Sequence, residues 1–182
     1  GGQVEGTQIR NGADQEVYGG TVISAIVSSG GNQGISGGIV SGASVDSGGR
    51  QDVFGGSVID TTVSGDQVVN EGATVRGSVL KSGGSQRVYG GVVTGTIVSR
   101  GAVQDLISGS VSGTTISSGG SQVIGGGACA VSTTILGGGL QEVQSAGIAS
   151  ATTINSGGTQ HVLSGGTAVG NVVNSGAIQN VE

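Results

Sequence analysis

Apolar and polar residues alternate in short segments that recur along the whole chain. Each segment is anchored on one glutamine, and these are Gln15, Gln33, Gln51, Gln67, Gln86, Gln104, Gln122, Gln141, Gln160 and Gln179. Two residues later stands Val, Ile or Leu without exception, from Val17 to Val181, whereas the residue in between is mixed and often charged. Because successive side chains of a strand point to opposite faces, the pattern predicts a short strand whose glutamine and aliphatic side chain point inward.

Each period of about 19 residues holds two further alternations. One follows a glycine pair and places an aliphatic residue inward, as in Val22 and Val40. The other reads Thr-x-Val or Thr-x-Ile, as in Thr61 and Val63, and its Thr and aliphatic side chains also point inward. The sequence thus predicts three short strands per period, joined by glycine-rich corners. One period, in "VSGDQVV" around Asp66, is shorter than the others.

Strands this short cannot bury an apolar face alone, so successive periods must stack, each strand pairing in parallel with its counterpart one period later. The sequence therefore predicts an all-β fold, a right-handed parallel β-helix of about nine to ten coils with roughly 19 residues per coil. A left-handed helix would repeat an aliphatic residue every sixth position, but steps of six from Val17 reach Ser29, Ser41 and Ser47. We expect one domain over residues 1–182, excised from a longer protein because both ends lie inside the repeat.

Composition agrees with such a solenoid and excludes several classes of protein. The 42 glycines suit corners with positive φ, and the absence of proline leaves backbone N–H groups available for the ladders. A net charge of −5, with six scattered Lys and Arg residues, argues against nucleic acid as a partner. The single cysteine, Cys129, allows neither an internal disulfide nor a cysteine-based zinc site, and no metal or other cofactor is expected.

Histidine and carboxylate residues, which often serve in catalysis, are present but do not cluster in the sequence. The one histidine, His161, lies in the outward column, and Glu16, Asp52, Asp105 and Glu142 occupy that column in different coils. Acid–base or nucleophilic chemistry needs unlike groups that converge in a cleft. We therefore expect no enzyme. A β-helix polysaccharide lyase or hydrolase, which needs carboxylates and a base clustered on one face, stays as the alternative.

An outward column of the third strand combines aliphatic and threonine side chains. Its members are Ile26, Thr62, Val79, Ile97, Thr115, Thr134, Thr153 and Val172. A flat surface of this kind is either a self-association face or only the expression of β-propensity at solvent-facing positions.

Three aromatic residues also share one repeat position, just before the glycine pair. They are Tyr18, Phe54 and Tyr89. The position suits packing against the corner, and the alternative is a sparse platform for sugar rings.

The pattern S-G-G-x-Q-x-V, then a glycine pair, then T-T-I/V-x-S-G-G, is seen in "TTISSGGSQVIGGG" and "ATTINSGGTQHVLSGG". Over essentially the whole chain it resembles the tandem repeats of AIDA-type self-associating autotransporter adhesins. The resemblance implies a passenger segment at the bacterial cell surface or outer membrane, or released from it, joined to the membrane only by a C-terminal translocator barrel that this chain lacks. It also implies adhesion to host epithelial surfaces, association with copies of itself, biofilm formation and virulence. A structural stalk without binding activity of its own remains an alternative.

The resemblance further implies that a dedicated bacterial heptosyltransferase attaches heptose to Ser and Thr hydroxyls before export. The expected acceptors are the serines of the S-G-G turns, namely Ser29, Ser47, Ser82, Ser118, Ser156 and Ser175, since a hydroxyl beside glycines protrudes toward a bulky transferase. Threonines of the third strands come second. The turn serine is missing or displaced at Asn11, Asp66 and Gly138, so we expect those coils to stay unmodified. The alternative is that these hydroxyls only solubilise the corners.

Overall fold

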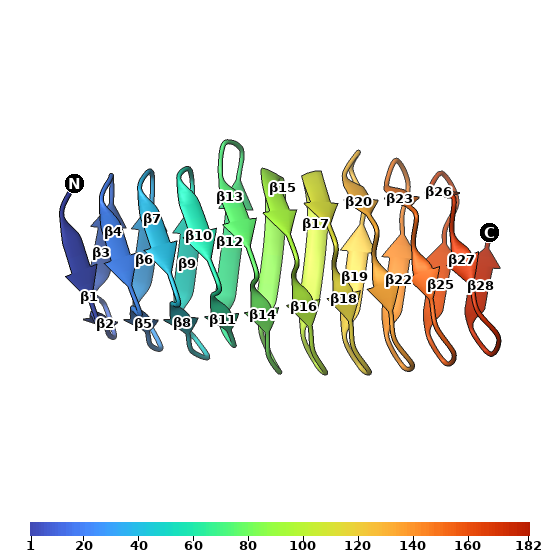
Figure 1. The fold of residues 1–182 in the computed structure, drawn as a ribbon, viewed down its shortest axis with the longest axis horizontal. Helices are drawn as coiled ribbons and strands as arrows, with labels where there is room; N and C mark the ends of the chain where they lie inside the picture. The colour runs from blue at the N-terminus through green and yellow to red at the C-terminus, as the bar shows by residue number, and fades with distance from the viewer.

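The computed structural model describes residues 1–182 and contains strands and turns but no helix. The chain winds along one axis into a rod with the two termini at opposite ends (Figure 1). Ten strands carry the recurrent glutamine, and each pairs in parallel with its counterpart in the next coil. The structure confirms the all-β parallel β-helix of about ten coils. Offsets between paired glutamines range from 16 to 19 residues, so the mean period is about 18, slightly below the predicted one.

Three sets of strands make up the coils. The glutamine strands are β3 (Asp14–Val17), β6 (Asn32–Ile35), β9 (Arg50–Val53), β12 (Asp66–Asn70), the first parts of β15 (Ser85–Thr94) and β17 (Val103–Ser112), β19 (Ser121–Ile124), β22 (Leu140–Val143), β25 (Thr159–Val162) and β28 (Ile178–Val181). The three-residue strands are β1 (Gln3–Glu5), β4 (Thr21–Ile23), β7 (Ile39–Ser41), β10 (Ser57–Ile59), β13 (Thr74–Arg76), the last parts of β15 and β17, β20 (Cys129–Val131), β23 (Ile148–Ser150) and β26 (Thr167–Val169). The two-residue strands are β2 (Gln8–Ile9), β5 (Ile26–Val27), β8 (Ser44–Val45), β11 (Thr62–Val63), β14 (Val79–Leu80), β16 (Ile97–Val98), β18 (Thr115–Ile116), β21 (Thr134–Ile135), β24 (Thr153–Ile154) and β27 (Val172–Val173).

These strands form two sheets. The ten two-residue strands form one sheet, and the other strands form a single sheet of 18 strands. The large sheet is continuous because β15 and β17 each run from the glutamine strand through the corner into the three-residue strand without a break. Each coil therefore has three corners. We call them the serine corner (before the glutamine strand, as in residues 28–31), the second corner (after it, as in residues 36–38) and the third corner (before the two-residue strand, as in residues 42–43).

The third corner requires a left-handed backbone in every coil. Glycine with positive φ fills this position in six coils, at Gly6, Gly42, Gly77, Gly95, Gly113 and Gly170. Ser24, Asp60, Ser132 and Ala151 fill it in the other four, with φ between 53° and 56°. A side chain with a Cβ is strained in this conformation, so these four coils carry a local cost that glycine avoids.

Two apolar ladders fill the interior. The larger joins the aliphatic residue of each glutamine strand to that of the three-residue strand, as in Val53 and Val58. The smaller is formed mainly by the two-residue strands, as in Val63 and Leu80. These are the inward positions predicted from the alternation. Between the two ladders lie the glutamines, of which Gln33 through Gln160 are fully buried.

The predicted outward column of the glutamine strands is buried in three successive coils, at Gly34, Asp52 and Val68. Asp52 is only 8% and Val68 only 6% exposed. Both still occupy the outer face by register, since Asp52 pairs with Val68 and Val68 with Arg87. Asp52 is covered from the side, because Arg50 lies along its own strand and binds the Asp52 carboxylate through two hydrogen bonds of 2.7 Å.

Candidate functional site

The serine corners form one long edge of the rod, and their serines are accessible. All six predicted acceptors, Ser29, Ser47, Ser82, Ser118, Ser156 and Ser175, are exposed. Each is followed by a glycine with positive φ, and the glycines at this position are linked from one coil to the next by backbone hydrogen bonds, such as Gly30 N–H to Gly48 C=O at 2.9 Å, except between Gly48 and Gly83. The positive φ favours glycine at this position in every one of these coils, and at Gly48 a Cβ would also come within 2.7 Å of Ser29 Oγ. The S-G-G sequence therefore holds a row of hydroxyls outward on a rigid backbone.

The hydrogen bonds between these glycines show which coils lack the corner serine, and they correct one of our predictions. The glycine ladder pairs Gly101 with Gly119, Gly119 with Gly138 and Gly138 with Gly157. The residue before each of these glycines occupies the serine position. Arg100, before Gly101, and Gly137, before Gly138, therefore replace serine in their coils. Asn11, before Gly12, replaces it in the first coil, as predicted. The prediction at Gly138 was displaced by one residue, because "LGGG" allows two alignments that only the backbone bonds distinguish. Asp66 is the first residue of β12, and the short corner before it holds only Ser64 and Gly65.

Sequence reasoning overlooked serines at the opposite edge of the rod. Ser36, Ser145 and Ser164 lie in second corners and are exposed. The strings Ser36-Gly37-Gly38 and Ser164-Gly165-Gly166 repeat the S-G-G signal of the serine corner. The same signal identifies these serines in the sequence, although they follow the glutamine strand and do not precede it.

The predicted association residues form a single straight column. They are the first residues of the two-residue strands, and the register runs from Ile26 through Ser44 to Thr62, then through Val79, Ile97, Thr115, Thr134 and Thr153 to Val172. Ile26, Ile97 and Val172 are exposed, and the other predicted members are half-buried. The structure thus brings the predicted residues together on one face, interrupted by Ser44.

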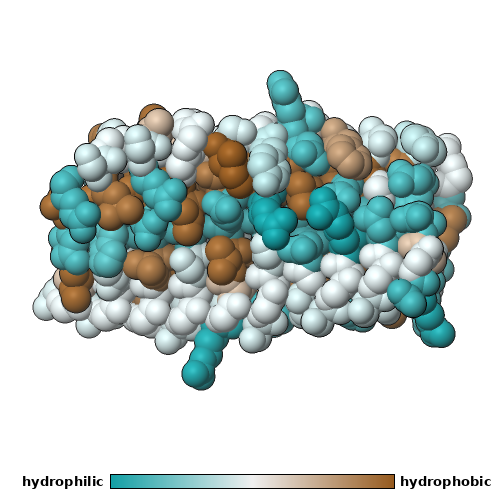
Figure 2. All heavy atoms as spheres, turned by 180° about the vertical axis from the view of Figure 1, so that it is seen from behind, coloured by the Kyte–Doolittle hydropathy of each residue, from teal (hydrophilic) through white to brown (hydrophobic).

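Charged groups are scattered. Figure 2 shows hydrophilic side chains distributed along one face of the rod. Two ion pairs occur, Arg50 with Asp52 at 2.7 Å and Arg87 with Asp66 at 3.4 Å. The hydrogen bond to Asp52 raises the pKa of the Arg50 guanidinium. No three His, Cys, Asp or Glu side chains meet in a way that would hold a metal ion. No helix is long and apolar enough to cross a membrane.

The three aromatic residues are exposed. Tyr18 is 77%, Phe54 55% and Tyr89 44% exposed, so their rings do not pack into the corner as we expected. The interior beside the second corners is occupied by the larger apolar ladder, which includes Ala73 and Ala128 of other coils.

The arrangement defines a rigid solenoid with one edge of hydroxyls and one Thr/aliphatic column. By sequence the chain matches no known protein family and no curated protein. Among solved structures it is similar to the TibC-catalysed hyper-glycosylated TibA55-350 fragment, with a TM-score of 0.75 and 29% identity over 100% of this chain and 82% of that one. This likeness supports an AIDA-type autotransporter passenger-like fold.

Proposed function

We propose that the chain is a non-enzymatic passenger module of a bacterial surface adhesin and an acceptor for O-heptosylation by a dedicated heptosyltransferase. The observation that carries the proposal is the row of exposed serines on glycine-stacked corners. The similar TibA fragment is hyper-glycosylated by TibC, and this chain has the same fold over its full length. A transferase needs a hydroxyl that stands clear of the backbone ladder, and the serine corner supplies one at six coils.

Adhesion follows from the second surface. The column from Ile26 to Val172 offers aliphatic and threonine side chains at the regular spacing of the coils, about 4.8 Å. Copies of the rod on neighbouring cells associate through this face, and the same exposed rod contacts host epithelial surfaces. Autoaggregation and biofilm formation are the expected consequences at the bacterial surface.

The test is to express the chain with and without TibC and to measure intact masses. We expect a ladder of heptose-sized increments only with the enzyme. Replacing the six corner serines by alanine should remove most of the increments, whereas replacing six half-buried hydroxyls of the strands, Thr21, Ser41, Ser57, Ser85, Thr94 and Ser121, should not. A single unmodified mass under both conditions would overturn the acceptor role. Sustained turnover of an acidic glycan by the purified chain would contradict the non-enzymatic role.

A further inference from the structure

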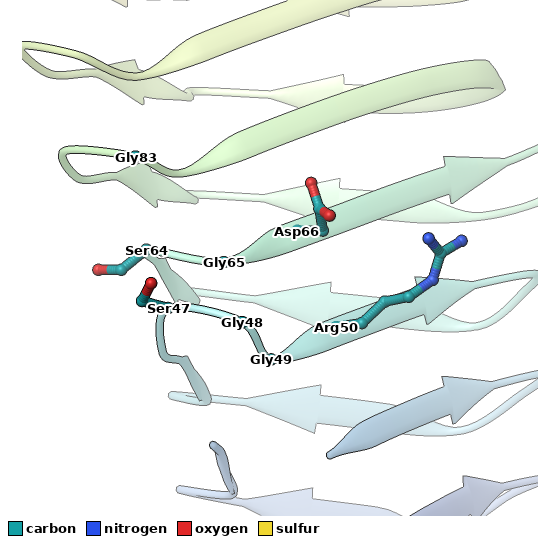
Figure 3. A pocket seen from close by; sticks show the side chains of 8 residues that line it. All are labelled: Ser47, Gly48, Gly49, Arg50, Ser64, Gly65, Asp66 and Gly83. Carbon is teal, nitrogen blue, oxygen red and sulfur yellow. The ribbon is translucent and has the colours of Figure 1, made fainter. Parts of the chain in front are cut away.

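The shortened coil leaves a notch in the serine edge. Where other serine corners have four residues, such as Asp46–Gly49 and Lys81–Gly84, this corner has only Ser64 and Gly65. A cavity of about 290 Å³ opens at this place, and no apolar side chain lines it. Its walls are the corner Ser47–Gly49 on one side and Gly83 on the other, and its floor is Ser64–Gly65 (Figure 3).

The notch interrupts the backbone ladder of the serine corners. Gly30 donates to Gly48, and Gly83 donates to Gly101. Between them a rung is missing, so the N–H of Gly48 and the C=O of Gly83 make no hydrogen bond within the chain. These are the only interior breaks of this ladder. One donor and one acceptor therefore face each other across a gap of one absent corner.

The groups around the gap favour a neutral, hydroxyl-rich ligand. Ser47 and Ser64 add two hydroxyls at the outer rim, and each can donate or accept. Arg50 extends away from the corner, and its charge is paired with the Asp52 carboxylate through two hydrogen bonds of 2.7 Å, which disfavours an anion. The Asp66 carboxylate lies 3.4 Å from the Arg87 guanidinium. Because Arg87 already balances the charge of Asp66, a cation is not favoured as the ligand of the notch. A pyranose ring fits these demands because one hydroxyl accepts from Gly48 while another donates to Gly83.

The geometry points to the notch as a seat for a single pyranose unit, which takes the place of the missing corner. The volume is at the small end for ligand pockets and suits one sugar rather than a long glycan. A sugar of this chemistry can come from either of two sources. One is a heptose on Ser47 or Ser82, which flank the notch, and this source rests on the proposed acceptor role. The other is a glycan carried by a different molecule.

Titration of the unmodified, ¹⁵N-labelled chain with methyl mannopyranoside tests the seat without any dependence on glycosylation. We expect saturable shifts of the Gly48 amide resonance with a millimolar Kd, and smaller shifts elsewhere. The control variant inserts Ser-Gly between Ser64 and Gly65, which rebuilds the S-S-G-G corner of residues 28–31. It should fold and lose at least tenfold in affinity. Absence of a saturable shift, equal binding by the filled variant, or saturation by phosphate or calcium instead of sugar would overturn the seat.

A second arm separates the sources. If the seated sugar is the chain's own, the TibC-modified chain shows the Gly48 resonance already shifted and takes up no added glycoside, and Ser47→Ala with Ser82→Ala reverses this. If the sugar comes from another molecule, the modified chain binds added glycoside like the unmodified one. Failure of TibC to modify the chain would sink the acceptor role alone, because the first arm uses unmodified protein.

Discussion

Gln86 Nε2 donates a 2.6 Å hydrogen bond to Oε1 of Gln67, its counterpart one coil earlier. The same bond recurs from Gln15 to Gln179, always from the later coil to the earlier one. A buried amide must find partners for its donors and its acceptor, and stacking satisfies each one with its neighbour. The ladder thereby fixes the register of the coils, since a slip of one residue would set each glutamine opposite an outward position, and a slip of two would place an aliphatic side chain against an amide.

Loss of one rung should destabilise the rod strongly. In Gln104→Leu, the buried Gln122 Nε2 and Thr114 Oγ1 both lose their acceptor. Each unsatisfied buried group costs about 1–3 kcal/mol, so we expect the free energy of unfolding to fall by about 3 kcal/mol. Chemical denaturation measures it. Gln144→Leu is the control, because Gln144 is exposed and should change stability by less than about 0.5 kcal/mol. Equal effects of the two substitutions would refute a structural role for the ladder.

The hydroxyls of the third corner should differ in how much each contributes to the free energy of unfolding. Thr114 donates to Gln104 Oε1 at 3.1 Å, as Ser78, Thr96, Thr133 and Thr152 do to their own glutamines, but the buried Thr61 Oγ1 has no partner. Thr114→Val should therefore destabilise by about 1 kcal/mol, whereas Thr61→Val should be neutral or stabilising by up to about 1 kcal/mol. The two midpoints of denaturation, compared with the parent, decide this. Destabilisation by Thr61→Val would show that its hydroxyl has a partner after all.

The fold was predictable because parity alone places the residues. Gln-x-Val must put both side chains on one face, and a fixed period must stack like on like, which the pairs Gln67 with Gln86 and Val69 with Val88 show. The bond from Thr114 to Gln104 was not predictable, because it depends on which strand faces which across the coil. The burial of Asp52 likewise depends on how Arg50 lies beside it.

The candidate surfaces were predictable to the same extent. The S-G-G signal located exposed hydroxyls correctly, but glycine runs such as "LGGG" hide the register, as Gly137 and Gly138 show. The notch also escaped prediction. The sequence showed a shorter period around Asp66, but only the backbone bonds show that Gly48 and Gly83 lost their partners.

Strain at the third corner should be relieved by glycine. Ala151 has φ of 54° in a position that glycine fills in six coils. Ala151→Gly should raise the free energy of unfolding by about 1 kcal/mol, and Gly113→Ala should lower it by a similar amount. The second change isolates the backbone effect, because a Cβ at Gly113 would meet no atom closer than 3.8 Å. Thermal unfolding of both variants, compared with the parent chain, measures the two changes in stability. A gain in stability from Gly113→Ala would show that the corner tolerates a side chain without strain.

Charge placed on the Thr/aliphatic column should disrupt association between rods. Ile97 and Val172 are 41% and 52% exposed, so lysine at both positions is tolerated by the fold but repels the same face of a second copy. We expect Ile97→Lys with Val172→Lys to slow the settling of bacteria that display the passenger by severalfold. Ile39→Lys with Val92→Lys is a matched control on the three-residue strands, since these residues are 43% and 49% exposed. Far-UV circular dichroism must show that both variants keep the β-fold. If the two variants settle at the same rate, the column from Ile26 to Val172 is not the association face, and its threonines only reflect the preference of exposed strands for β-branched residues.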